Sequence, residues 1–184
     1  MDRLEQAKSR PAVIEGALRS ALRDAIAWRI GGGRPPSPEA FAGAAIASAR
    51  STLDALDSGS DERSRTLAAA RRVAQRFTAS ALYRRLMQVP TARFLRLDRS
   101  AHRADAIVRD RRQRLHAIVL TVRHDAFDAG RLASQIARAT PLSASDRLNR
   151  LTVHVFSLRT AQRFTFERDV CPLAAKPDST ARVA

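Results

Sequence analysis

Residues 104–122 read ADAIVRDRRQRLHAIVLTV, and this stretch is the most informative part of the sequence about the fold. Residues 104–110 and 115–122 are rich in Ala, Ile, Val and Leu, as strands of a sheet are. Between them lie only Arg111, Arg112, Gln113 and Arg114. So short and polar a connection predicts a tight turn, and we therefore expect a β-hairpin with a strongly basic tip.

The sequence that follows the hairpin predicts a crossover. Residues 125–139 (DAFDAGRLASQIARA) have helical periodicity, and residues 151–158 (LTVHVFSL) and 162–167 (QRFTFE) alternate as strands do. A helix between two strands of one sheet allows those strands to run parallel. We expect one parallel pair at this crossover, and a hairpin around residues 159–161.

The sequence before residue 104 predicts mainly helices. Apolar residues recur at helical spacing in residues 9–30, 38–56 and 60–88, and Gly31–Gly33, Gly59 and Pro90 mark the ends. Leu82 and Leu86 fall off the apolar stripe of the third helix, so we expect it to be kinked near Ser80 or buried on two sides. Residues 92–98 (ARFLRLD) alternate apolar and polar side chains and predict one more strand. The expected fold is α+β: three N-terminal helices, then a small mixed sheet of about five strands with one crossover helix.

The predicted elements divide the chain into three parts. Residues 1–58 form a helical region, residues 59–169 a basic α/β core, and residues 170–184 a polar tail that we expect to be disordered.

Composition excludes several classes of protein. The chain has 184 residues, 45% of them hydrophobic, and a single cysteine, Cys171, which rules out a disulfide framework and a cysteine zinc cluster. No window of 18 apolar residues and no apolar leader are present. We therefore expect a cytoplasmic protein without a membrane span.

The charge of the chain is strongly positive and unevenly distributed. Its 33 Lys and Arg against 18 Asp and Glu give a net charge of +15, and only Lys8 and Lys176 are lysines. The excess of arginine also fits codon usage in a GC-rich bacterial genome. Residues 59–113 hold 14 basic and 5 acidic residues, whereas residues 1–58 are nearly neutral. Such a localised excess attracts polyanions, and the arginine fork binds phosphate with two hydrogen bonds.

Two groups of arginines are candidates for nucleic-acid contact. Arg65, Arg72 and Arg76 share a face of the helix at 60–88, with Tyr83 expected on the same stripe. The hairpin adds Arg109, Arg111, Arg112 and Arg114. Contacts of this kind are made to phosphates, so we expect little sequence specificity and a steep dependence on salt. An aromatic content of 5% argues against a platform on which the bases of a single strand stack.

Residues 61–158 follow the order helix, three strands, helix, strand. This order resembles the core of the PD-(D/E)XK nuclease superfamily, the restriction-endonuclease-like fold. The resemblance places Asp105 at the aspartate that begins the second core strand, where the family binds Mg²⁺. The positions of its Glu-x-Lys pair hold Val119 and Thr121, which supply neither a metal-binding carboxylate nor a cationic nitrogen. The resemblance thus implies a nuclease-like domain that binds nucleic acid without a metal cofactor, with Asp105 as a vestige of catalysis.

Two other functions stay open. A Mg²⁺-dependent nuclease would need relocated carboxylates, for which the sequence offers Glu15, Asp110, Asp125, Asp128 and Glu167. An interaction or assembly protein could oligomerise or dock through its N-terminal helices. The small residues of the second helix that favour close helix contact are Ala42, Gly43, Ala45 and Ala49.

The histidines carry a weaker signal. His116 shares a strand face with Ile118 and Leu120, and His154 shares one with Phe156. We expect both to be partly buried and hydrogen-bonded side chains rather than metal ligands.

Overall fold

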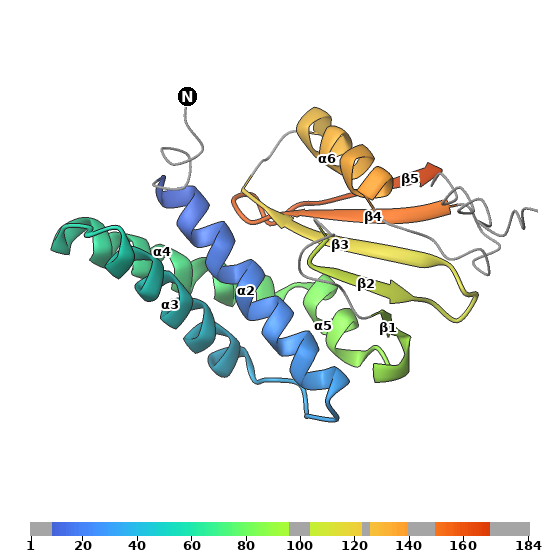
Figure 1. The fold of residues 1–184 in the computed structure, drawn as a ribbon, viewed down its shortest axis with the longest axis horizontal. Helices are drawn as coiled ribbons and strands as arrows, with labels where there is room; N and C mark the ends of the chain where they lie inside the picture. Colours follow the sequence, from blue (N-terminus) through green and yellow to red (C-terminus); the bar gives the residue numbers. More distant parts are fainter. Residues whose placement is uncertain (1–8, 96–103, 123–125, 140–149, 170–184) are drawn as a thin grey trace, which may run out of the picture.

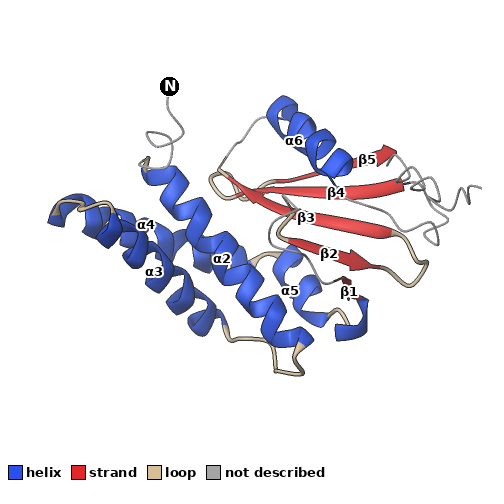
Figure 2. Ribbon diagram, viewed as in Figure 1, coloured by secondary structure: helices blue, strands red, loops and turns tan. Residues whose placement is uncertain are grey.

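The computed structural model describes residues 9–95, 104–122, 126–139 and 150–169. Within them the chain is α+β, as predicted, and a mixed sheet separates a group of helices from a single helix, α6, on its other face (Figures 1 and 2). The predicted tail at 170–184 lies outside the described residues.

Four helices precede the sheet. They are α2 (Arg10–Ile30), α3 (Pro38–Ala55), α4 (Ser60–Ala79) and α5 (Ala81–Gln88). The first two begin with a serine N-cap followed by proline, and the Ser37 hydroxyl accepts a hydrogen bond from Ala40 N at 3.1 Å. Helix α2 ends at Gly31 and Gly32, where the positive φ of Gly32 (91°) requires a residue without a Cβ.

The one helix expected at 60–88, kinked near Ser80 or buried on two sides, is in fact two helices, because the chain breaks at Ser80. Ser80 has an extended backbone (ψ 152°), and its hydroxyl caps α5 by accepting a hydrogen bond from Tyr83 N. The break turns Leu82 and Leu86, which do not fit the apolar stripe of α4, into the core. Tyr83 is also buried and therefore does not extend the arginine stripe.

The sheet has the order β1-β2-β3-β4-β5. After a short 3₁₀ turn (Thr91–Arg93) come β1 (Phe94–Leu95), β2 (Ala106–Arg109), β3 (Leu115–Thr121), β4 (Arg150–Ser157) and β5 (Arg163–Asp169). Only two described residues of the strand expected at 92–98 are extended, and residues 96–98 lie outside the described part. The other predicted strands are present with bounds shifted by one or two residues.

Both predicted connections are present. Strands β2 and β3 pair antiparallel around the basic turn, while β3 and β4 pair parallel, Leu115 opposite Leu151, across the crossover helix α6 (Ala126–Ala139). Strand β5 returns antiparallel to β4. The parallel pair therefore lies at the centre of the sheet, where both its faces are covered.

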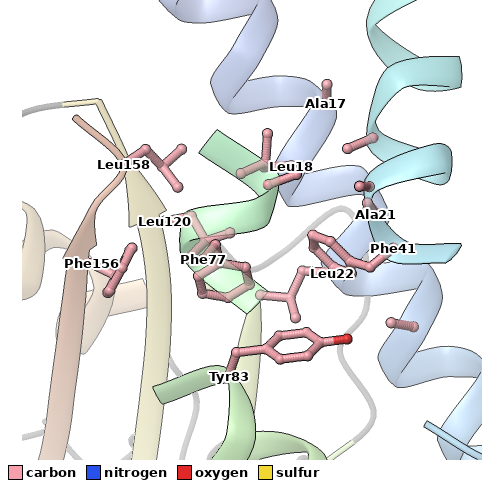
Figure 3. Close-up of a cluster of buried hydrophobic side chains, with 14 of the residues drawn as sticks. Ala17, Leu18, Ala21, Leu22, Phe41, Phe77, Tyr83, Leu120, Phe156 and Leu158 are labelled. Atoms are coloured by element: carbon pink, nitrogen blue, oxygen red, sulfur yellow. The ribbon is translucent and has the colours of Figure 1, made fainter. Parts of the chain in front are cut away.

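Two apolar clusters hold the layers together. On one face, α2, α3, α4 and α5 pack against Ile118, Leu120 and Phe156, and on the other face α6 packs against Val119, Val153 and Val155. Phe77 at the end of α4 is fully buried between the bundle and the sheet. Its ring lies 5.7 Å from that of Phe41, 5.4 Å from Tyr83 and 5.3 Å from Phe156 (Figure 3).

Most of the small residues of α3 are part of this core. Ala42, Ala45 and Ala49 are buried within the chain's own bundle, while Gly43 is exposed. They allow α3 to approach α2 and α4 closely, and three of the four are thus not available to a second molecule.

Candidate nucleic-acid interface

Asp105 lies at the entry to β2 and is 1% exposed. Its Oδ1 is bound by two arginines of α2, Arg19 Nε at 2.8 Å and Arg23 Nη2 at 3.2 Å, and its Oδ2 accepts a hydrogen bond from Leu120 N at 2.8 Å. Its own backbone N–H donates to Ile118 O. Every oxygen of this carboxylate therefore has a partner from the protein, and the side chain joins α2 to the edge of the hairpin.

Glu15, one turn before Arg19, belongs to the same network. Its Oε1 lies 3.3 Å from Arg19 Nη1, and its Oε2 accepts a hydrogen bond from Val122 N at 2.8 Å. Burial lowers the pKa of Arg19, but the charges and hydrogen bonds of Asp105 and Glu15 outweigh burial and raise it. We call Glu15, Arg19, Arg23 and Asp105 the buried ion network.

The buried ion network holds arginine cations where the nuclease resemblance implies a metal. A Mg²⁺ ion here would have two carboxylates, and it would have to displace Arg19 from both of them. Val119, the position matched to the family's glutamate, packs in the α6 cluster, while the Asp105 carboxylate turns to α2. In the part of the chain that the structure describes, no three His, Cys, Asp or Glu side chains gather as metal ligands.

The other candidate carboxylates do not join Asp105, apart from Glu15. Asp110 lies at the opposite end of β2, Asp128 is in the first turn of α6, and Glu167 is exposed on β5. Asp125 lies outside the described residues. Of the four described carboxylates among these five positions, the structure thus brings only Glu15 into contact with the partners of Asp105, and Asp110 lies at the other end of β2.

The turn end of the hairpin borders a cleft of about 500 Å³, which we call the arginine cleft. It lies between α5 and the sheet face that carries Val108, His116 and His154. Its lining contains seven arginines: Arg85, Arg93, Arg109, Arg111, Arg112, Arg114 and Arg163. Arg93 and Arg109 are half-buried, and the other five are exposed.

Asp110 is the carboxylate among the residues lining the cleft. Its Oδ1 accepts hydrogen bonds from Arg112 N (2.8 Å) and Arg114 N (2.9 Å), which close the turn, and its Oδ2 binds Arg114 Nε at 2.9 Å. Desolvation raises the pKa of Asp110, but the hydrogen bonds from Arg114, His116 and Arg112 hold it well below its usual range. Among the described residues that line the cleft, one ionised carboxylate is thus present beside seven guanidinium groups.

Two histidines lie in the cleft and contact each other. The rings of His116 and His154 are stacked at an interplanar angle of 8°, with His116 Nδ1 3.1 Å from His154 Nε2. His116 Nε2 lies 3.3 Å from Asp110 Oδ2, and His154 Nδ1 lies 3.2 Å from Thr165 Oγ1. Burial, followed by the positive charges of His116 and Arg163, lowers the pKa of His154 to about 4. His154 is therefore neutral at pH 7, and both rings are partly buried and hydrogen-bonded, as the sequence predicts.

The structure separates the two groups of arginines that the sequence singled out. Arg109, Arg111, Arg112 and Arg114 all line the cleft, whereas Arg65, Arg72 and Arg76 are exposed on α4, in the helical bundle, and do not line it. Figure 1 shows α4 on the side of the molecule away from the basic turn.

Sequence reasoning missed three arginines of the cleft. Arg85 lies on α5, Arg93 in the 3₁₀ turn and Arg163 at the start of β5. Arg163 is opposite Phe156 in the register with β4, so the predicted hairpin contained a signal for its position. Arg85 carried no such signal, because the break at Ser80 sets the direction in which α5 points.

Comparisons with protein-family models, with curated proteins and with solved structures give no significant match to this chain. In its described residues no helix is both long and apolar enough to cross a bilayer.

Proposed function

We propose that the protein binds nucleic acid through its phosphates, and that the arginine cleft is the contact surface. The observation that carries this proposal is the ratio of charges in the cleft, where seven arginines line a concave surface with Asp110 as the carboxylate among them. Arginines concentrated in this way release counterions from a polyanion on binding and grip phosphate oxygens with paired hydrogen bonds.

Binding without cleavage is the second part of the proposal. The order of strands, the hairpin and the crossover helix supports a nuclease-like core, as the sequence resemblance implies. The carboxylate at the matching position is neutralised by Arg19 and Arg23. A carboxylate already bound by two guanidinium groups is a poor ligand for Mg²⁺, which requires several oxygen ligands and waters in a near-octahedral arrangement.

Two triple variants of equal charge test which surface binds. Arg111→Ala/Arg112→Ala/Arg114→Ala removes three charges from the cleft, and Arg65→Ala/Arg72→Ala/Arg76→Ala removes three from α4. Fluorescence anisotropy of labelled duplex DNA, single-stranded DNA and RNA, titrated at several salt concentrations, gives affinity and its salt dependence.

We expect the cleft variant to bind at least about tenfold more weakly and to lower the slope of log K against log salt by about 2–3. The α4 variant should bind nearly as the unmodified chain does. Equal losses in the two variants would mean that binding follows net charge, and would overturn the assignment to the cleft. Because Arg114 also bonds Asp110, Arg111→Ala/Arg112→Ala serves as a variant that leaves the turn intact.

A further inference from the structure

The floor of the arginine cleft is apolar, which phosphate contact alone does not require. Beneath the arginines, the lining consists of Leu82, Leu86, Val89, Val108 and Ile118. Four of these side chains are buried at 2–7% exposure, and Val89 is half-buried at the end of α5. The cleft therefore combines a cationic rim with a floor that favours a nonpolar, flat group.

The size of the cleft limits what can reach this floor. A volume of about 500 Å³ is in the range of sites that hold one small molecule. It accommodates one nucleotide and is far too small for a duplex, whose bases are covered by their neighbours in the stack. A base reaches the floor only if it is unpaired.

The planar groups that could stack on such a base are present without aromatic residues. The partly buried, parallel imidazoles of His116 and His154 line the cleft, together with the guanidinium planes of its arginines. Bases stack on histidine and arginine planes as well as on aromatic rings. His154, being neutral at pH 7, offers such a plane without the hydration shell of an ion.

We infer that the arginine cleft takes one unpaired nucleotide, with its base on the apolar floor and its phosphates on the arginine rim. This inference rests on the proposed function and names its substrate class: nucleic acid with a single-stranded end or overhang, rather than a continuous duplex.

The test compares two DNA duplexes of equal phosphate number. One is blunt and carries 2-aminopurine at an internal paired position, and the other carries it at the unpaired end of a short overhang. Anisotropy reports binding of either duplex, and the emission of 2-aminopurine reports the surroundings of the base. The two readouts are independent.

We expect the overhang duplex to bind about fivefold more tightly or better, the low end of what stacking one base contributes. Its 2-aminopurine emission should change on binding, and that of the paired base should not. Equal affinities without an emission change in the overhang would overturn the inference while leaving nucleic-acid binding intact. Absence of binding to both duplexes at low salt would instead overturn the proposed function.

A pair of matched variants tests whether the preference for the overhang depends on the apolar floor of the cleft. Val89→Thr makes the floor more polar at nearly constant volume and charge, and Val73→Thr makes the same change at a half-buried position of α4 outside the cleft. Val89→Thr should reduce the preference for the overhang, and Val73→Thr should leave it unchanged. A preference that survives Val89→Thr unaltered, or falls equally in both variants, counts against a base on this floor.

Discussion

The two ends of the β2–β3 hairpin use arginine in opposite ways. At the end near α2, Arg19 and Arg23 are matched by Asp105 and Glu15, and the groups are joined at 2.8–3.3 Å. At the turn end, seven arginines line a cleft whose described lining has one carboxylate, Asp110. The net charge of the chain does not distinguish these regions. The local ratio of cations to carboxylates does, and on this basis we propose that the first region stabilises the fold and the second binds nucleic acid.

Burial explains why the two ends differ. A carboxylate at 1% exposure must be paired, since an isolated buried charge is costly, and two arginines and a backbone N–H meet that need at Asp105. The exposed side chains of Arg111 and Arg112 in the turn stay hydrated and carry no such requirement. Their charge is therefore available to an external anion.

The largest effect is expected from Asp105→Ala. The substitution removes the acceptor of Leu120 N–H and the buried carboxylate that Arg19 and Arg23 share, and it should lower the free energy of unfolding by about 3–5 kcal/mol. Urea denaturation measures the change. Asp54→Ala, which removes the exposed pair of Asp54 with Arg63 (2.7 Å), is the control and should cost less than about 1 kcal/mol. Similar values for the two would mean that the buried ion network does not stabilise the fold.

A smaller effect is expected from Glu15→Ala, about 1–2 kcal/mol, because Val122 N–H loses its acceptor and Arg19 loses one of two partners. Glu15→Gln keeps an acceptor for Val122 N and should cost less. Since Arg19 links Glu15 to Asp105, the double variant Glu15→Ala/Asp105→Ala should be less destabilised than the two single losses added together. Simple additivity in the same urea titrations would contradict a shared network.

Local patterns in the sequence predict the sheet well. Three features depend only on residues that are close in sequence: the alternation in 151–158, the tight turn at 111–114 and the helix before β4. The structure confirms all three. The positions of Leu82 and Leu86 off the apolar stripe predicted a kink near Ser80 or burial on two sides, but not a helix end, because Ser80 is neither glycine nor proline. Its extended backbone is stabilised by capping α5 and by the burial of Leu82, Tyr83 and Leu86.

The candidate site is predicted only in part, for a physical reason. The arginines of the turn are adjacent in sequence and lie together in the cleft. Arg19 and Asp105 are 86 positions apart, and no local pattern indicates that α2 crosses the start of β2. His116 and His154 are neighbours because β3 and β4 run parallel in one register, with Ile118 opposite His154, and the pattern within either strand does not indicate that register.

The stability of the fold should also depend on pH, because the cleft contains His154. The pKa of His154 is about 4 in the folded chain, below the ordinary histidine value near 6.5, so the unfolded chain takes up a proton more readily. Stability should therefore decline as pH falls from about 6.5 to about 4. Solvent screening at this partly exposed ring limits the loss to about 1–2 kcal/mol.

Urea midpoints at pH 7, 5 and 4 measure this decline, and His154→Gln should flatten it. The low pKa of Asp110 places its own contribution in a different window, below about pH 4, where protonation releases its hydrogen bonds to the turn. A decline between pH 6.5 and 4 that is identical in His154→Gln would assign it to other groups.

The smallest effect gives the most direct contrast between the two ends. Asp110→Asn removes the carboxylate from the cleft, while its amide oxygen can still accept hydrogen bonds from Arg112 N and Arg114 N. Nucleic acid should then bind about threefold more tightly, as expected when one exposed negative charge near bound phosphates is lost. Asp54→Asn removes the same charge from the helical bundle, outside the cleft, and should change the affinity much less. Anisotropy with one labelled oligonucleotide at fixed salt compares the two. An equal gain in both variants would show that net charge governs binding, and the difference in the ratio of cations to carboxylates between the two ends of the hairpin would then have no consequence for binding.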